Sequence, residues 1–200
     1  MGSEMCIRDR IYTIPMMETI NKAELTNYEI LDGILTPTKQ STAFFQDNEF
    51  DNVTYIGACS HLTSIKSNAF PNTGKIRFLH LGGHNPNGRK NTQYVIEEFI
   101  QALSYSSQIE LSVYSQVNIE GVNIESLPSE IKIEIGILGE DEIENAYINH
   151  DVSIQVPSIE GIGLGLYEAI QFGTPVITFD VAPNNEIIED NVTGWLIQSK

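Results

Sequence analysis

The chain has 200 residues, 41% of them hydrophobic, and its 27 acidic and 11 basic residues give a net charge of −16. This length suits one globular domain or one domain with part of another, and the negative field argues against binding to nucleic acid or to anionic lipid surfaces. Two cysteines are too few for a disulfide framework or a zinc set, which favours a reducing, cytoplasmic compartment, and no apolar run is long enough to span a membrane.

The first part of the chain has a weak pattern. Residues 1–10, MGSEMCIRDR, show no hydrophobic period and resemble a translated adaptor sequence, so we set them aside as a non-native leader. Within residues 11–60, YEILDGILTPTKQSTAFFQ predicts a strand, a loop and a short helix, and NVTYIGA predicts another strand. Residues 61–74, with Ser, Asn, Pro and Gly, have the composition of a linker.

From Lys75 onward, apolar strand patterns alternate with amphipathic helix patterns. Strands are expected in KIRFLHLGG, IELSVYS, IKIEIGIL, DVSIQVP, TPVITFD and GWLI, and helices in TQYVIEEFIQAL, DEIENAYIN, GLGLYEAIQFG and NNEIIED. Gly173 stands where a helix commonly ends on a left-handed residue. The chain stops at WLIQSK, just after the last expected strand, and we expect it to be a piece of a longer protein.

Such alternation predicts an α/β fold with a parallel sheet covered by helices on both faces. In these sheets, ligands bind at the carboxyl ends of the strands, in the loops that lead to the helices. Two loops of this kind stand out here, Gly82–Asn91 and Pro157–Leu164, which follow the first and fourth strands of the regular region. We therefore expect the functional site where these two loops meet.

The second loop combines glycines with carboxylates. Glycine lets the backbone approach a ligand closely, and the first N–H groups of a helix lack internal partners and bind phosphate. Glu160 and Glu168, eight positions apart, flank this turn and are suited to bind the hydroxyls of a sugar and of a ribose. Acids near a helix start also stabilise the helix dipole without any ligand. The turn does not fit the G-x-G-x-x-G dinucleotide fingerprint, since Leu166 and Glu168 stand at the two possible last positions.

The first loop contributes adjacent cations. Arg89 and Lys90 lie at the mouth of a helix in a chain with only 11 basic residues. A guanidinium can bind two phosphate oxygens at once, and an ammonium adds a point charge. The same pattern is also compatible with two solvated cations in a loop that bind no ligand. His84 is expected to be a surface residue, and His80 and His84 straddle two glycines, which does not favour a metal site.

These residues carry a resemblance to a known family. PSIEGIGLGLYEAIQFG, residues 157–173, resembles the E-x7-E signature of the retaining glycosyltransferases of family 4, the glycosyl transferases group 1 domain. TPVITFDVAPNNEIIEDNVTGWLI is similar to the strand, acidic loop and closing strand that follow in that family, and FLHLGGHNPNGRKN to its first strand and phosphate-binding loop. The resemblance covers about residues 75–197.

The resemblance implies a fold and a division of the chain. Residues 75–200 would form the donor-binding domain of the two-domain GT-B fold, a Rossmann-like doubly wound parallel sheet truncated at its C-terminus. Residues 11–60 would be a remnant of the N-terminal domain. The acceptor site and part of the donor pocket would come from the N-terminal domain.

It also implies roles for individual residues. Glu168 would bind the nucleotide ribose, Glu160 would face the donor sugar, and Glu186 would be a further donor ligand. The base would be recognised by backbone near Gly136–Glu140 and Pro157. The diphosphate would be held by Gly82, Gly83, Arg89, Lys90, Gly161, Gly163 and Leu164, and the residues acting in catalysis would be Glu160, Arg89 and Lys90. The chain departs from the family pattern at Gly83 or His84, where arginine is common, and at Gly165, where a bulkier apolar residue is common.

The implied function is transfer of a hexose, with retention, from a nucleoside-diphosphate sugar to a hydroxyl on a carbohydrate, lipid-linked or protein acceptor, as in polysaccharide biosynthesis. The donor is a substrate, and neither a cofactor nor a metal is expected. Two alternatives stay open: a fragment that binds a nucleotide without catalysis, or a sugar phosphorylase or epimerase with a similar domain.

Overall fold

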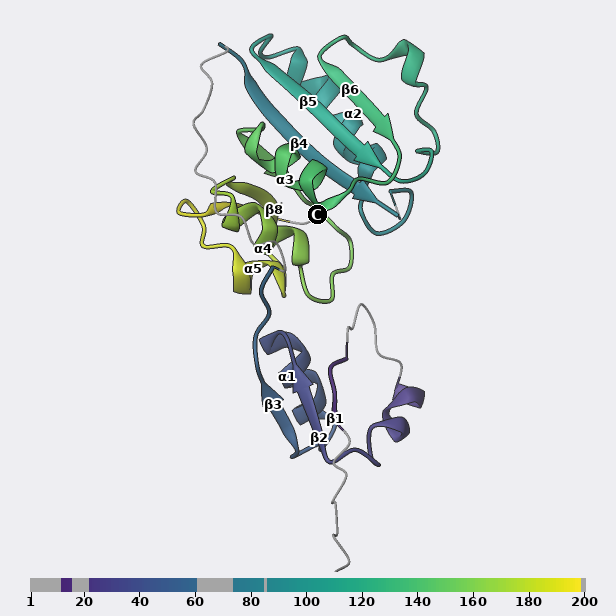
Figure 1. Ribbon diagram of the computed structural model, residues 1–200, viewed down its shortest axis with the longest axis vertical. Coiled ribbons are helices and arrows are strands. Elements are labelled where there is room, and N and C mark those ends of the chain that lie inside the picture. The colour runs from purple at the N-terminus through teal and green to yellow at the C-terminus, as the bar shows by residue number, and fades with distance from the viewer. Residues whose placement is uncertain (1–11, 16–21, 61–73, 85, 199–200) are drawn as a thin grey trace, which may run out of the picture.

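The computed structural model describes residues 12–15, 22–60, 74–84 and 86–198. The expected leader, residues 1–10, and nearly all of the expected linker, residues 61–74, lie outside these ranges. The described residues form two parallel sheets, one of three strands and one of six. Figure 1 shows the smaller sheet below the larger one, each with its own helices.

The smaller sheet is built from residues 12–55 and has the order β1-β2-β3 with parallel pairing throughout. A strand, a loop and a helix follow one another between residues 28 and 47, as the sequence predicts. The very short β1 and the 3₁₀ helix η1 were not expected from the pattern. The elements are β1 (Tyr12–Thr13), η1 (Lys22–Asn27), β2 (Gly33–Thr36), α1 (Lys39–Asp47) and β3 (Val53–Tyr55).

The larger sheet confirms the alternating α/β pattern and the doubly wound parallel fold. Its strand order is β6-β5-β4-β7-β8-β9, and all five pairings are parallel. Its elements are β4 (Ile76–Gly83), α2 (Thr92–Leu103), β5 (Ile109–Ser115), the 3₁₀ helix η2 (Ile124–Ser126), β6 (Ile131–Ile135), α3 (Glu140–Ile148), β7 (Val152–Ile154), α4 (Leu164–Gln171), β8 (Val176–Phe179), α5 (Asn184–Ile187) and β9 (Gly194–Ile197).

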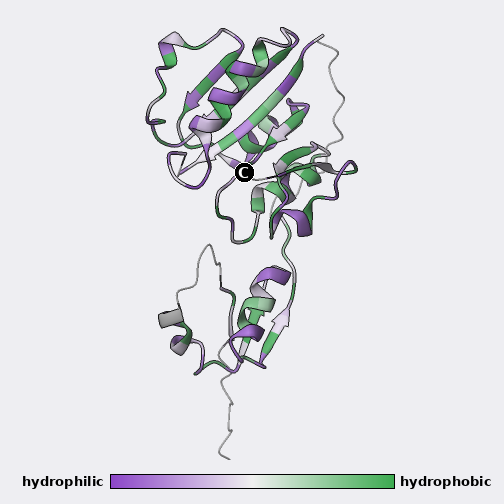
Figure 2. Ribbon diagram, turned by 180° about the vertical axis from the view of Figure 1, so that it is seen from behind, coloured by the Kyte–Doolittle hydropathy of each residue, from purple (hydrophilic) through white to green (hydrophobic). Residues whose placement is uncertain are grey.

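Hydrophobic cores lie on both faces of this sheet. Neighbouring residues of a strand point to opposite faces, and in β4 Leu79 belongs to the core with α3 and α4 whereas Phe78 packs on the core with α2. The rings of Phe78 and Phe99 meet edge to face with centroids 5.5 Å apart. Along α2, hydrophobic and hydrophilic residues alternate around the helix, which places one apolar face against the sheet (Figure 2).

Several elements are shorter than the sequence predicts. β6 ends at Ile135 rather than at Leu138, because its partner strand β5 ends opposite it at Ser115. β7 ends at Ile154, three residues before Pro157. α5 ends at Ile187 because the next residue, Ile188, has an extended backbone. Gly173 has a φ of 70° after α4, as expected for a helix end.

Candidate functional site

The two loops singled out in the sequence meet at the centre of the larger sheet. β4 and β7 are neighbours, and the chain winds outward from them in both directions, through β5 and β6 on one side and β8 and β9 on the other. The Asn91 side-chain amide donates to the Val156 carbonyl oxygen at 2.7 Å, and the Ser158 amide donates to the Arg89 carbonyl oxygen at 2.8 Å. The loops therefore form one unit at the topological switch point, the usual place for a ligand in this architecture.

A buried histidine fixes the start of α2. His80 lies in β4 with one ring nitrogen 2.8 Å from the Ile154 carbonyl oxygen and the other 2.9 Å from Thr92 Oγ1. Burial lowers the pKa of His80 to about 4, so the ring is neutral at neutral pH. His80 thus joins β4, the end of β7 and the first residue of α2, and it holds the backbone that carries Arg89 and Lys90. His84 is exposed, as predicted.

Glu160 stands at the centre of the positive groups of both loops. Its carboxylate oxygens lie 3.2 Å from Arg89 Nη1 and 3.2 Å from Lys90 Nζ. The backbone amides of Gly161 and Gly163 also donate to Glu160 Oε1, at 3.2 and 3.3 Å. Burial alone raises the pKa of Glu160, but the charges of Lys90 and Arg89 and these hydrogen bonds outweigh it and lower the pKa. The loops therefore already bind one anionic group.

A cavity of about 150 Å³ opens beside this carboxylate. The turn that shapes it depends on Gly163, whose φ of 81° is rarely adopted by other residues and which precedes the first residue of α4. Five residues predicted from the sequence line the cavity: Arg89, Lys90, Glu160, Gly161 and Leu164. Ile162 and Gly165 also line it, whereas Gly163 does not. Two cations and helix-start amides beside a cavity are groups that can bind an anion.

Glu168 lies one helical turn beyond Leu164 and Gly165, which line this cavity, and is not itself a lining residue. It sits in α4, is half-buried, and its Oε2 lies 3.1 Å from the hydroxyl of Tyr147 in α3. Tyr147 is fully buried, and neither Tyr147 nor its partner Gln155 was singled out in the sequence. Tyr147 fits the apolar face of an amphipathic helix, so the pattern gave no sign of it. The signal for Gln155 was a polar residue inside an apolar strand pattern.

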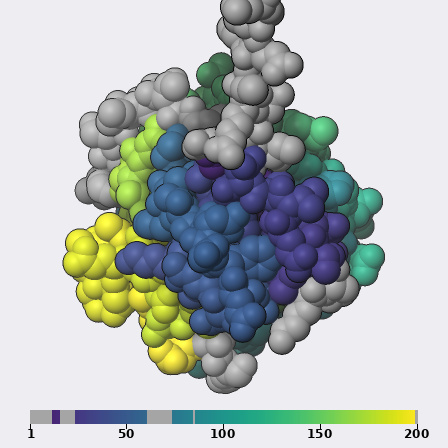
Figure 3. All heavy atoms as spheres, turned by 90° about the horizontal axis from the view of Figure 1, so that it is seen from below, coloured from purple at the N-terminus to yellow at the C-terminus, as the bar shows by residue number. Residues whose placement is uncertain are grey.

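Glu186 does not line the cavity. Its carboxylate accepts hydrogen bonds from the backbone amides of Lys39 and Gln40 at 2.7 and 2.8 Å. A carboxylate at this position stabilises the positive end of α1. The contact joins the smaller sheet unit to the end of the larger one, and Figure 3 shows the purple-to-blue surface of the first with the yellow C-terminal surface at its edge.

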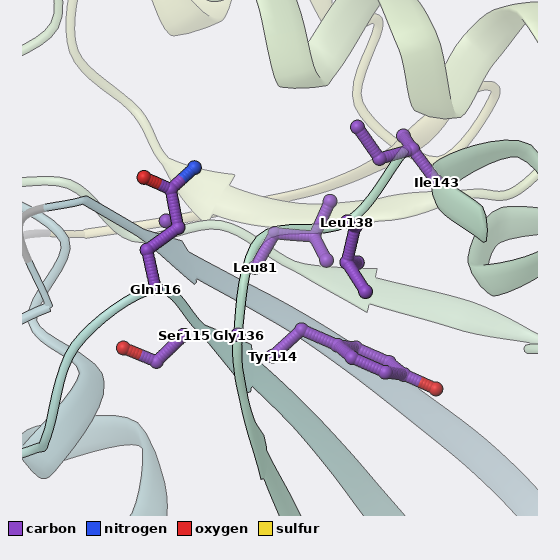
Figure 4. A pocket seen from close by; sticks show the side chains of 8 residues that line it. Leu81, Tyr114, Ser115, Gln116, Gly136, Leu138 and Ile143 are labelled. Atoms are coloured by element: carbon purple, nitrogen blue, oxygen red, sulfur yellow. The ribbon is translucent and has the colours of Figure 1, made fainter. Parts of the chain in front are cut away.

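A second, more apolar cavity lies between the carboxyl ends of β4, β5 and β6. It has a volume of about 80 Å³, and Gly83 forms part of its wall. Gly82, the other predicted glycine of this turn, is buried, and a Cβ there would lie 2.8 Å from Thr92 Oγ1. Figure 4 shows the remaining lining residues, which include the stretch from Gly136 expected to recognise a base: Leu81, Tyr114, Ser115, Gln116, Gly136, Leu138 and Ile143.

The described parts of the chain hold neither a cluster of metal-binding side chains nor a helix suited to span a membrane. Among those residues, no group of three or more His, Cys, Asp or Glu side chains is placed to hold a metal ion. No helix within the same ranges is both long and apolar enough to cross a membrane.

A match to a protein-family model shows the family to which the chain belongs. The model described as glycosyl transferases group 1 matches residues 75–200, more than half of the chain. The chain belongs to this glycosyl transferases group 1 family. The six-stranded sheet and its helices match the domains of GT-B glycosyltransferases, as the sequence resemblance implies.

Curated relatives are similar over part of the group 1 chain. It is 29% identical over 112 residues to the UDP-N-acetylglucosamine–peptide N-acetylglucosaminyltransferase GtfA subunit of Streptococcus pneumoniae, over 55% of this chain and 22% of the relative. It is 27% identical over 149 residues to the GtfA subunit of Limosilactobacillus reuteri, over 73% of this chain and 28% of the relative. The chain thus spans roughly a quarter of the length of these relatives.

Solved structures share the fold at low sequence identity. The pneumococcal O-GlcNAc transferase GtfA in complex with UDP and GlcNAc has a TM-score of 0.69 and 21% identity, over 90% of this chain and 36% of that one. TarM has a TM-score of 0.75 and 16% identity, over 94% of this chain and 40% of that one. At these identities, the likeness supports the fold of the group 1 chain.

Proposed function

We propose that the protein carrying this chain is a retaining glycosyltransferase of family 4 that transfers a hexose from a UDP-sugar to a hydroxyl acceptor, and that residues 75–200 are its donor-binding domain. The observation that carries the proposal is the anion site at the switch point. Arg89, Lys90 and the amides of Gly161 and Gly163 already hold one carboxylate there. A diphosphate presents the same negative oxygens to the same groups.

The two cavities and Glu168 supply the other donor contacts in this proposal. The apolar cavity at Gly136 and Leu138 is the place for the base, bound through backbone groups. Glu168 accepts hydrogen bonds from the ribose hydroxyls, and Glu160 turns toward the donor sugar. UDP is the nucleotide proposed, because the GtfA relatives are named for UDP-N-acetylglucosamine and the similar GtfA structure contains UDP.

The proposed chemistry follows from the charge that develops on the leaving group. As the bond between the sugar and the diphosphate breaks, negative charge grows on the diphosphate oxygens. Lys90, Arg89 and the amides at the start of α4 stabilise that charge from fixed positions. The acceptor is a hydroxyl on protein, carbohydrate or lipid-linked sugar, and protein is favoured by the peptide named in the GtfA relatives.

Nucleotide binding by this chain tests the proposal. We expect ligand-observed NMR to detect binding of UDP in preference to GDP and ADP. We expect Glu168→Ala to weaken UDP binding by at least about tenfold, the effect of losing one hydrogen bond to a charged group. Glu125→Ala is a matched control, since Glu125 is an exposed acid in η2. If the folded chain binds none of the three nucleotides, the proposed donor site is contradicted. Turnover that depends on phosphate and needs no nucleotide would favour a sugar phosphorylase.

A further inference from the structure

A buried polar network stands behind Glu168. The hydroxyl of Tyr147 in α3 lies 3.1 Å from Glu168 Oε2 and 3.1 Å from the Gly165 carbonyl oxygen, both in α4. The Gln155 side-chain amide, just after β7, donates to the same carbonyl at 2.8 Å and lies 3.3 Å from the Tyr147 hydroxyl. The same amide lies 3.2 Å from Ser153 Oγ. α3 and the end of β7 thus converge on the turn of α4 that carries Glu168.

The burial of this network makes its geometry definite. Tyr147 is 0% exposed and Gln155 8% exposed, so their polar groups depend on each other rather than on water. Burial raises the pKa of Tyr147 well above its ordinary value, and the charge of Glu168 raises it further. The hydroxyl therefore keeps its proton and donates at neutral pH. Stacking of its ring on Phe172, with centroids 5.9 Å apart, holds the side chain in place.

Gly165 connects the network to a peculiarity of the sequence. A Cβ at this position would lie 2.5 Å from Gln155 Oε1, so a side chain there would displace the glutamine. The departure from a bulkier residue at Gly165 is thereby explained: the space holds the Gln155 amide. An apolar side chain would fill the same space without needing hydrogen-bond partners, so a polar group there calls for a role other than packing.

We propose that Tyr147, held by Gln155, is a positioning residue that orients the Glu168 carboxylate toward the ribose hydroxyls of the donor nucleotide. The inference rests on the proposed function, in which Glu168 meets the ribose. The Tyr147 hydroxyl contacts Oε2 from the core side and so fixes the direction of the carboxylate. Without the hydroxyl, the Glu168 carboxylate loses this hydrogen bond, and its orientation is less narrowly defined before a nucleotide binds.

The discriminating measurement is the preference for UDP over 2′-deoxy-UDP. We expect the unaltered chain to bind UDP more tightly, and Tyr147→Phe to reduce this preference by about threefold because one orienting hydrogen bond is lost while the ring stays. Gln155→Leu, which removes the amide that fixes the hydroxyl, should reduce the preference in the same direction and serves as the second variant. Glu168→Gln is the reference that shows how much of the preference depends on the carboxylate.

The outcomes separate the two proposals. If the unaltered chain binds neither nucleotide, or if Glu168→Gln keeps the full preference, the ribose role of Glu168 fails and the inference fails with it. If Glu168→Gln loses the preference but Tyr147→Phe and Gln155→Leu both keep it, only the positioning role is overturned. Equal weakening of both nucleotides, with a lower melting temperature and an unchanged preference, would mean that Tyr147 only stabilises the fold.

Discussion

Lys90→Ala should weaken the binding of UDP to this chain by about 10- to 100-fold, the range expected when a hydrogen-bonded ion pair with a phosphate is lost. The effect is large because Lys90 has a double role at the switch point. Its ammonium is one of two side-chain cations beside the cavity, and it also neutralises Glu160, 3.2 Å away. Without it, Arg89 is the remaining side-chain cation among the cavity-lining residues, and Glu160 is less well compensated.

The control for Lys90 removes the same charge elsewhere. Lys132 is exposed on β6, so Lys132→Ala changes the net charge of the chain equally without touching the loops. Isothermal titration calorimetry with UDP at low and at physiological salt compares the two variants. Equal affinities for Lys90→Ala and the unaltered chain, both folded by circular dichroism, would remove Lys90 from the anion site.

Glu160→Gln should have the opposite effect on UDP, strengthening its binding by about tenfold. In the described structure, the Glu160 carboxylate occupies the groups proposed for the diphosphate, so a diphosphate must displace it or lie beside it. The repulsion between two unit charges a few ångströms apart is roughly 1 kcal/mol in water and roughly 4 kcal/mol near a protein surface. The substitution removes this repulsion between Glu160 and a phosphate. The neutral amide retains the shape of the side chain.

A UDP-sugar should respond differently from UDP in this variant. If Glu160 faces the donor sugar, as proposed, the gain at the diphosphate is offset by weaker contacts to the sugar, so the advantage of a UDP-sugar over UDP shrinks. Glu125→Gln, an exposed acid in η2, controls for the change in net charge. Weaker UDP binding in Glu160→Gln than in this control would contradict the view that the carboxylate competes with the diphosphate.

The sequence predicted most of the larger sheet because its signals are local. Strand and helix periods over residues 75–197 predicted every strand and α-helix of that sheet but not the 3₁₀ helix η2, and the glycines with Arg89 and Lys90 marked the two loops. Strand order set the rest: the loops meet because β4 and β7 are neighbours, and parallel α/β units normally place ligands at such a point.

What the sequence could not predict depends on contacts between distant residues. Glu186 caps α1, which lies 146 and 147 positions away along the chain, and no local pattern reports such a partner. The pairing of Tyr147 with Glu168 joins two helices whose sequences read only as amphipathic. The contacts of Glu160 with Arg89 and Lys90 also join residues of two separate loops. Each loop by itself indicated a contact with a ligand and not a contact with the other loop.

The most direct test of the central claim is to locate UDP on the chain by ¹H–¹⁵N correlation NMR. If the anion site binds the diphosphate, UDP shifts the backbone amides of Gly161 and Gly163 most strongly, because they exchange the Glu160 carboxylate for a phosphate. Amides around Gly136 should shift as the base enters the apolar cavity. Saturating UDP that leaves Gly161 and Gly163 unmoved in a folded chain would contradict the account.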